Sequence, residues 1–99
     1  MKKILVLEDE PNIRSFVVIN LRRNGYQPIE AENGMQALSK LEENPDTCLA
    51  LLDVMLPGMS GFEMASKIRG ADSHVPIIFL TARSSEEDVL NGFKSGGDD

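Results

Sequence analysis

The chain has 99 residues, of which 41% are hydrophobic and 26% are charged, and this predicts one small globular domain over residues 1–99. Its 16 acidic and 10 basic residues give a net charge of −6, and no run of basic residues is longer than a pair, so we expect no direct contact with DNA or RNA. The single cysteine excludes an internal disulfide bond, and one cysteine with one histidine excludes a zinc site built from this chain's own thiol and imidazole ligands.

The first half of the chain predicts two strands and two helices. Ile4–Leu7 is a continuous apolar run, which is typical of a strand buried on both faces. The run is too short for a signal peptide or a membrane span, so we expect a cytoplasmic protein with no membrane contact. Apolar residues at every fourth position predict a helix over residues 11–23, followed by a weaker strand over residues 26–31. A second helix is expected from its apolar stripe, Met35, Ala37, Leu38 and Leu41.

The second half of the chain repeats this pattern. Cys48–Leu52 is another continuous apolar run, and we interpret Cys48 as a small buried hydrophobic residue. The sequence S-x-x-E at residues 60–63 predicts a capping box at the start of a helix. The buried face of that helix is expected to hold Phe62, Ala65 and Ile68. Val75–Leu80 predicts a fourth strand, and a second S-x-x-E at residues 84–87 predicts a final helix.

The alternation of strands and helices predicts an α/β fold with a doubly wound parallel sheet, because crossover helices cover both faces of such a sheet. In sheets of this kind, ligands bind beyond the carboxyl ends of the strands. Three of these strand ends carry polar side chains, namely Glu8 with Asp9, Asp53, and Thr81. If the first and third strands are neighbours, the three carboxylates lie in one pocket.

Three carboxylates in one pocket repel each other unless a cation neutralises them. Carboxylate oxygens are ligands that Mg²⁺ prefers, so Glu8, Asp9 and Asp53 predict a divalent cation site. A cation beside a carboxylate also suits phosphoryl transfer, with an aspartate as nucleophile and Thr81 as hydrogen-bond donor to the phosphoryl group. The simpler interpretation is that acidic residues at strand ends cap the next helix or face solvent, and we favour it for Glu10.

Three segments carry a family resemblance: ILVLEDE at residues 4–10, DVMLPGMSG at residues 53–61 and PIIFLTAR at residues 76–83. They resemble the receiver domain of bacterial two-component response regulators, and the similarity runs in order along all 99 residues. The resemblance implies a flavodoxin-like sheet with strand order 2-1-3-4. It also implies a signalling switch and not an enzyme, apart from self-phosphorylation and autodephosphorylation at Asp53.

The resemblance implies a role for each acidic residue of the predicted pocket. Asp53 corresponds to the phosphoacceptor, which takes a phosphoryl group from a histidine kinase. Asp9 corresponds to the direct Mg²⁺ ligand, and Glu8 corresponds to an acidic neighbour that acts on the metal mainly through water. The backbone carbonyl of Met55 corresponds to a further metal ligand.

Two further residues correspond to the family's switch. Thr81 corresponds to the hydroxyl that closes on the phosphoryl group, and Ala82 to a backbone N–H that binds it. Phosphorylation would then change the interaction surface of the domain. Many relatives carry a C-terminal DNA-binding domain, so we expect regulation of transcription through an output domain that is not present in these 99 residues.

The family's pattern continues beyond Asp99 with a fifth strand, which carries a lysine that contacts the phosphoryl group, and a fifth helix. Without them, the strand over residues 75–80 would be an exposed apolar edge. We therefore expect either a truncated receiver domain or a fragment whose open edge pairs with a second copy, as a homodimer or a strand-swapped assembly.

Three other interpretations stay open. A flavodoxin-like cofactor binder would need glycine-rich phosphate loops, and neither G-x-G-x-x-G nor G-x-x-x-x-G-K-[ST] occurs. A pseudo-receiver would bind partners without taking phosphate; the complete acidic set argues against it and the missing lysine favours it. A hydrolase would need G-x-S-x-G, to which residues 58–61 are only a near miss, and the sole histidine, His74, is expected in an exposed loop.

Overall fold

The computed structural model describes residues 1–56, 58–71 and 73–80 of the chain. In chain order its elements are β1 (Lys3–Leu7), α1 (Pro11–Arg23), β2 (Gln27–Ala31), α2 (Gly34–Glu43), β3 (Thr47–Asp53), β4 (Met55–Leu56), β5 (Met59–Ser60), α3 (Gly61–Gly70) and β6 (Ile77–Leu80). The helix predicted at residue 84 and beyond lies outside the described residues, as do Thr81 and Ala82. Within the described ranges, no helix has the length and apolar character needed to cross a membrane.

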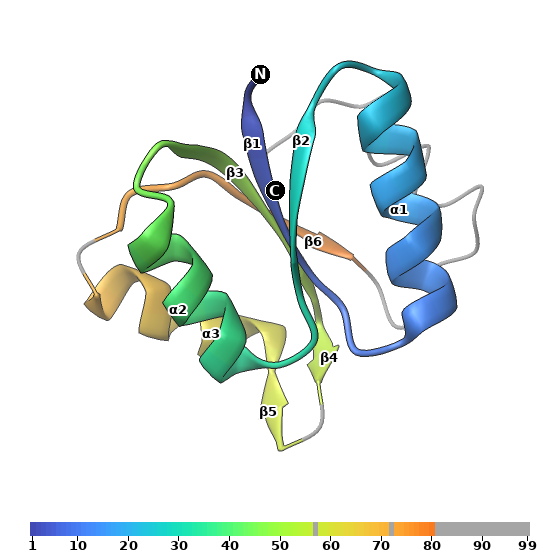
Figure 1. Ribbon diagram of the computed structural model, residues 1–99. Coiled ribbons are helices and arrows are strands. Elements are labelled where there is room, and N and C mark those ends of the chain that lie inside the picture. Colours follow the sequence, from blue (N-terminus) through green and yellow to red (C-terminus); the bar gives the residue numbers. More distant parts are fainter. Residues whose placement is uncertain (57, 72, 81–99) are drawn as a thin grey trace.

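Four parallel strands form the central sheet in the order β2-β1-β3-β6 (Figure 1). This order confirms the predicted flavodoxin-like arrangement, with β6 as the fourth strand. β1 lies between β2 and β3, so Leu5 pairs with Ile29 on one side and with Ala50 on the other. β3 then pairs with β6, where Leu52 lies opposite Phe79.

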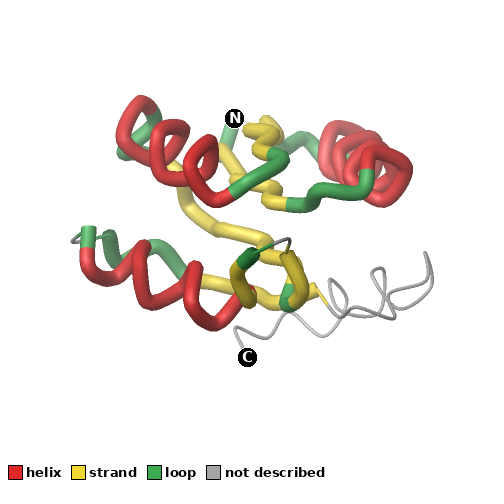
Figure 2. The backbone as a smooth tube through the Cα atoms, turned by 90° about the horizontal axis from the view of Figure 1, so that it is seen from below, coloured by secondary structure: helices red, strands yellow, loops and turns green. Residues whose placement is uncertain are grey.

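Helices cover both faces of this sheet, with α1 on one face and α2 and α3 on the other (Figures 1 and 2). Successive residues of β1 point to opposite faces, as the pleat of a strand requires. Val6 joins the buried cluster that includes Val17 of α1. Leu5 joins the other cluster, with Ala37 of α2 and Met64 of α3. Burial on both faces explains why β1 and most of β3 are continuous apolar runs.

Each described helix begins at a side chain that accepts a hydrogen bond from its first turn. The capping pairs are Glu10 with the Asn12 N–H (2.8 Å), Asn33 with the Gln36 N–H (2.9 Å) and Ser60 with the Glu63 N–H (3.1 Å). These contacts satisfy backbone donors that have no partner inside the helix. They confirm the capping predicted at Glu10 and at Ser60.

Cys48 was predicted to be buried, and this prediction is wrong, because its side chain is exposed. The reason is an irregularity in the pairing of β3 with β1. Lys3 pairs with Thr47, but the next residue, Ile4, pairs with Leu49. Cys48 is therefore the extra residue of a β-bulge, where one strand has a residue without a partner in the ladder.

Two apolar side chains at helix starts are also exposed, against expectation. Phe62 is 62% exposed and Met35 is 83% exposed. α3 buries Ile68, as predicted, and Ala65 is partly buried against the same cluster. The other buried residues are Gly61 and Met64, so the buried face is rotated by about one residue from the predicted one. The Phe62 ring still contacts the ring of Phe79, with the two centroids 4.7 Å apart.

A short antiparallel hairpin that the sequence did not predict follows β3. β4 and β5 pair Met55 with Ser60 and Leu56 with Met59. Gly58 lies in the connection with φ of 75°, a left-handed conformation that favours glycine. Strands of two residues are too short to produce a periodic pattern in a sequence.

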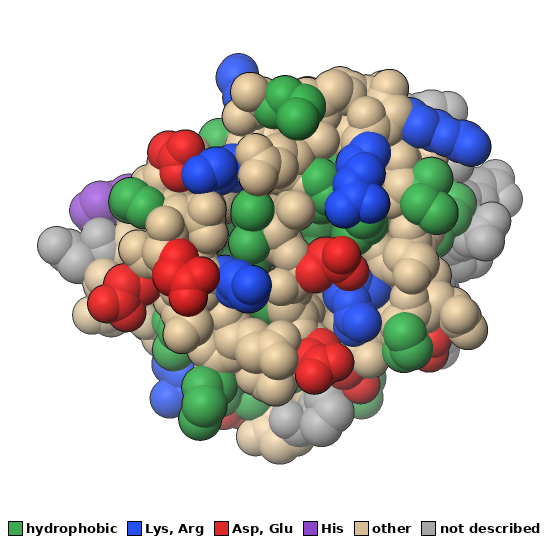
Figure 3. Space-filling view, viewed as in Figure 1, with side chains coloured by type: hydrophobic (Ala, Val, Ile, Leu, Met, Phe, Trp, Pro, Cys, Tyr) green, Lys and Arg blue, Asp and Glu red, His purple; other side chains and the backbone are tan. Residues whose placement is uncertain are grey.

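Charged side chains of both signs are interspersed on the face of the molecule shown in Figure 3. No large area of this face is of a single sign, which agrees with the isolated basic pairs in the sequence.

Candidate functional site

Glu8, Asp9 and Asp53 come together at the carboxyl ends of β1 and β3. Because Leu7 pairs with Leu52 in the parallel register, the residues that follow in each strand lie side by side. One carboxylate oxygen from each acidic residue lies within 4.8 Å of the other two. Glu8 is 3% exposed and Asp53 is 7% exposed, whereas Asp9 is exposed to solvent. The site therefore has two buried carboxylates and one at its mouth.

The electrostatics of the site show the cost of burying these groups. Burial raises the pKa of the Glu8 carboxyl to about 8. A hydrogen bond from the Glu10 N–H, 3.0 Å long, lowers this pKa, while a hydrogen bond to Asp53 and the charge of Asp53 raise it. At neutral pH and without a cation, the Glu8 carboxyl is therefore mostly protonated.

Arg14 of α1 positions the peptide that carries Glu8. Its Nη1 donates a hydrogen bond of 2.7 Å to the backbone carbonyl of Glu8. Its Nε forms an ion pair with the Glu30 carboxylate at 3.3 Å. On the other side, the Glu8 N–H donates to the carbonyl of Ala31 at 3.1 Å. Both polar groups of the Glu8 backbone are thus held where the strand ends.

Asp53 is the last residue of β3, and three hydrogen bonds donated by backbone N–H groups fix its surroundings. The Met55 N–H donates to Asp53 Oδ1 at 3.1 Å. The Val54 N–H donates to the Leu80 carbonyl of β6 at 2.9 Å, and the Gly61 N–H donates to the Val54 carbonyl at 2.8 Å. One carboxylate oxygen is therefore oriented by the chain that immediately follows the strand.

The donor set of the site fits a hard divalent cation. All three side chains offer oxygen ligands, and two of them are buried carboxylates that need a counter-charge. The raised pKa of Glu8 is a sign of this need, because a bound cation favours the charged form of a nearby carboxylate. Mg²⁺ suits a site with a few carboxylates and an exposed side, where water molecules complete its coordination.

The structure brings together three of the predicted site residues and leaves the others untested. Met55 lies beside the cluster with its side chain exposed. Thr81 and Ala82 lie outside the described residues. The sequence did not predict Arg14 as a partner of Glu8, and no local signal identifies it, because the contact joins a helix to the preceding loop.

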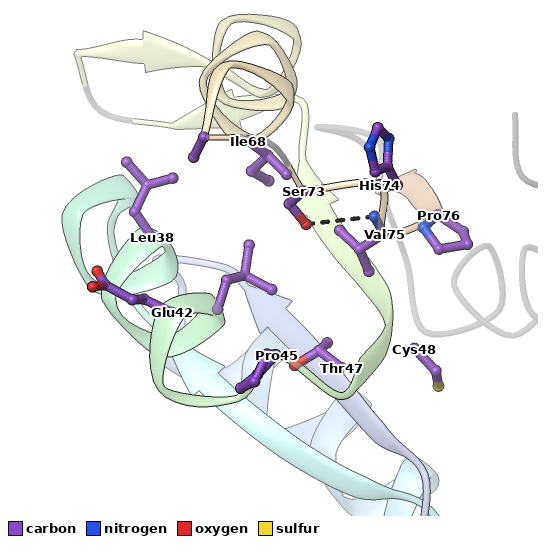
Figure 4. Close-up of a pocket in the computed structure, with 12 residues that line it drawn as sticks. Leu38, Glu42, Pro45, Thr47, Cys48, Ile68, Ser73, His74, Val75 and Pro76 are labelled. Atoms are coloured by element: carbon purple, nitrogen blue, oxygen red, sulfur yellow. Dashed lines mark hydrogen bonds between the residues drawn. The ribbon is translucent and has the colours of Figure 1, made fainter.

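A separate groove of about 880 Å³ lies between α2 and α3, at the amino ends of β3 and β6 (Figure 4). Apolar side chains such as Leu38 and Ile68 form much of its lining. Cys48 and His74 also line it, and His74 is exposed as predicted. The groove lies at the opposite ends of the strands from the three carboxylates, so this groove is not the site of the predicted chemistry.

Comparison with known proteins identifies the family. The chain matches the response regulator receiver domain over residues 4–99. The chain belongs to this family. Receiver domains are signalling switches and not metabolic enzymes, which confirms the coarse function predicted from the sequence.

Curated relatives of this receiver domain are regulators of transcription. It is 43% identical over 100 residues to the phosphate regulon transcriptional regulatory protein PhoB of Escherichia coli, a match that covers 99% of this chain and 43% of PhoB. It is 44% identical over 99 residues to the alkaline phosphatase synthesis transcriptional regulatory protein PhoP of Bacillus subtilis. This match covers 99% of this chain and 40% of PhoP. The chain thus spans less than half the length of these relatives.

Two solved structures of one similar protein contain a bound ligand or a partner protein. Response regulator TrrA of Thermotoga maritima in complex with Mg²⁺-BeF is 42% identical, with a TM-score of 0.76, and the match covers 94% of this chain and 80% of TrrA. The structure of TrrA in complex with histidine kinase ThkA gives 45% identity and a TM-score of 0.75. This match covers 86% of this chain and 72% of the matched chain.

Proposed function

We propose that this receiver domain is a phosphoacceptor switch, which takes a phosphoryl group from a histidine kinase onto Asp53. The observation that supports this proposal most strongly is the position of Asp53. Its buried carboxylate ends a rigid central strand and lies within 4.8 Å of two further carboxylates. A buried carboxylate among other carboxylates is not explained by a surface ion pair or by contact with solvent. It is well placed to act as a nucleophile beside a bound cation.

The residues of the site have distinct roles in this proposal. Asp9 would bind Mg²⁺ directly, Glu8 would act through a water molecule, and the Met55 carbonyl would complete the set of protein ligands with Asp53. When bound, Mg²⁺ offsets the negative charge on the phosphoryl oxygens. The relative TrrA has been seen with Mg²⁺-BeF, which supports the same cation here.

The chemical step uses the second oxygen of the Asp53 carboxylate. The Met55 N–H holds Oδ1, so Oδ2 is the oxygen that attacks phosphorus. The P–N bond of the kinase's phosphohistidine breaks as the new P–O bond forms. The leaving imidazole nitrogen keeps the electron pair of the broken bond and takes up a proton from water. The product is an acyl phosphate on Asp53, which Thr81 binds through its hydroxyl and Ala82 through its backbone N–H.

The acyl phosphate would act by shifting an equilibrium between two surfaces of the domain. A histidine kinase is proposed as the partner because the similar protein TrrA forms a complex with one. We also propose that this receiver domain acts in the cytoplasm. Control of transcription through an output domain is proposed because PhoB and PhoP are transcriptional regulatory proteins.

Self-association through the outer edge of β6 stays a prediction. The residues that follow Leu80 lie outside the described part of the chain, so the structure does not test it. The molar mass of the protein in solution decides between a monomer and a dimer.

Thermal stability with a phosphoryl analogue tests the proposed site. Beryllium fluoride forms a tetrahedral anion that can stand in for a phosphoryl group on a carboxylate. We expect Mg²⁺ and beryllium fluoride together to raise the Tm of the protein, because a ligand that binds only the folded state stabilises it. The same mixture without Mg²⁺ should leave the Tm unchanged, and Asp53→Asn should show no rise beyond that produced by Mg²⁺ alone. An equal rise for Asp53→Asn would contradict the proposal.

A further inference from the structure

Gly61 is pressed against the backbone of Asp53. A Cβ atom added at Gly61 would collide with the carbonyl oxygen of Asp53 and would lie 2.8 Å from the Val54 Cα and 3.0 Å from the Asp53 carbonyl carbon. Real Cβ atoms are essentially never found so close to backbone atoms. Backbone, unlike the end of a long side chain, cannot move aside without shifting β3. Glycine at this position therefore permits a contact that no other residue allows.

The β4–β5 hairpin brings Gly61 to this position. The chain leaves β3 at Asp53, turns at Gly58 and returns through Ser60, which pairs with Met55. Gly61 is also the first residue of α3, and Ser60 caps that helix. Because α3 packs Met64 into the core, the returning chain is anchored on a rigid helix.

We propose that this hairpin and Gly61 form a backbone clamp that positions the Asp53 carboxylate, so that Gly61 is a positioning residue for phosphoryl transfer. The clamp consists of residues 54–56 and 58–61, and it closes with the hydrogen bond from the Gly61 N–H to the Val54 carbonyl. Closure holds the Met55 N–H against Asp53 Oδ1 and turns Oδ2 toward the incoming phosphorus. The role of Gly61 in phosphoryl transfer rests on the proposed function, in which Asp53 is the phosphoacceptor.

The expected effect follows from the geometry that such a reaction needs. A nucleophile must be held within about 0.5 Å of its productive position, and a displacement of about 1 Å can cost a factor of about 100 in rate. A methyl group at residue 61 must push the Asp53 peptide or the hairpin away by a comparable distance. The carboxylate would then lose its hydrogen bond from the Met55 N–H, and Oδ2 would no longer be oriented toward the phosphorus atom.

Gly61→Ala tests the clamp, with Gly70→Ala as the matched control. Both glycines lie in α3 and receive the same methyl group, but an added Cβ at Gly70 meets nothing within 4 Å. We expect Gly61→Ala to slow the phosphorylation of Asp53 by acetyl phosphate at least tenfold at saturating Mg²⁺ and saturating donor. Gly70→Ala should stay within twofold of the parent rate. A purely structural role would change the fraction of folded protein, not the rate constant of that fraction at saturation.

A second measurement separates failure of the clamp from failure of the proposed function. The amide resonance of Met55 reports its hydrogen bond to Asp53 without any phosphoryl group. We expect it to move in Gly61→Ala and to keep its position in Gly70→Ala. If the parent protein takes no phosphoryl group, the proposed function fails. The Met55 resonance alone then tests whether the clamp positions the Asp53 carboxylate. A parent-like resonance, or a parent-like rate at saturation, in folded Gly61→Ala overturns the inference.

Gly58→Ala decides the matter if Gly61→Ala does not fold. Its Cβ meets nothing within 4 Å, but its φ of 75° is strained for alanine, so the hairpin turn is disturbed without a collision at Asp53. We expect a threefold or greater loss in rate and a shifted Met55 resonance. A folded Gly58→Ala with both properties unchanged overturns the clamp.

Discussion

At the scale of single residues, Glu8 has the most unusual chemistry. Its pKa in the folded protein is about 8, against an ordinary value of 4.5. Between these two pH values the folded state binds more protons than the unfolded state, so the free energy of unfolding falls as pH rises. We predict that the metal-free protein loses at least about 1 kcal/mol of stability between pH 5 and pH 8 because of this group.

Urea unfolding at a series of pH values checks this prediction. In Glu8→Gln the side chain cannot ionise, so the fall in stability between pH 5 and pH 8 should be largely removed. Mg²⁺ should raise the stability of the parent protein most at pH 8, where the Glu8 carboxylate is more often charged. A parent protein whose stability rises over this range would show that Glu8 is not protonated by its burial.

Arg14 gives a second prediction at this scale. Its guanidinium bridges the Glu8 carbonyl and the Glu30 carboxylate, a geometry that a lysine ammonium cannot reproduce with two separate nitrogens. Arg14→Ala should cost about 1 kcal/mol of stability and weaken Mg²⁺ binding several-fold, and Arg14→Lys should restore only part of either. Arg22→Ala, an exposed arginine of α1, is the control. Calorimetric titration with Mg²⁺ measures the affinities, and equal affinities for Arg14→Ala and Arg22→Ala would refute the positioning role.

At the scale of elements, the caps make the helix boundaries testable. Asn33 accepts a hydrogen bond from the Gln36 N–H at the start of α2. Asn33→Ala should cost about 1 kcal/mol of unfolding free energy, because a backbone donor loses its partner. Ser39→Ala, at an exposed position of the same helix, should change the stability by less than about 0.5 kcal/mol. Denaturant unfolding of both variants measures the difference, and similar values would show that the cap contributes nothing.

The elements also show what a sequence can and cannot predict. The helix over residues 11–23 and the apolar strands were predictable, because their signals are local: a proline at the first helical position, periodic apolar residues and continuous apolar runs. The exposure of Cys48 was not, because it depends on a bulge in the pairing with a distant strand. The exposure of Phe62 depends on which face of α3 meets the sheet, and a rotation by one residue changes that face without altering the pattern.

At the scale of the whole molecule, two hydrophobic clusters share one sheet. Leu51 and Leu52 are adjacent and both fully buried, but Leu51 packs under α1 and Leu52 under α2 and α3. We predict that Leu51→Ala and Leu52→Ala each cost about 2–5 kcal/mol of unfolding free energy. Met35→Ala, at an exposed position, should be nearly neutral. Urea unfolding measures all three, and a cost below about 1 kcal/mol for either leucine would mean that one face of the sheet is open.

The candidate site was predictable only as far as it depends on topology. In a parallel sheet with neighbouring first and third strands, Glu8, Asp9 and Asp53 must meet, and their carboxylate oxygens do lie within 4.8 Å of one another. The parts that hold them, Arg14 and Gly61, come from tertiary contacts that leave no periodic signal. The roles of Thr81 and Ala82 stay predictions, because both residues lie outside the described part of the chain.

The most direct test is the intact mass of the protein and of Asp53→Asn after incubation with acetyl phosphate and Mg²⁺. We predict a single phosphoryl adduct on the parent protein that is labile to base, as an acyl phosphate is. The adduct should not form on Asp53→Asn, and chelation of Mg²⁺ should prevent it on the parent. An equal adduct on Asp53→Asn, or none on the folded parent, would contradict the assignment of Asp53 as the phosphoacceptor.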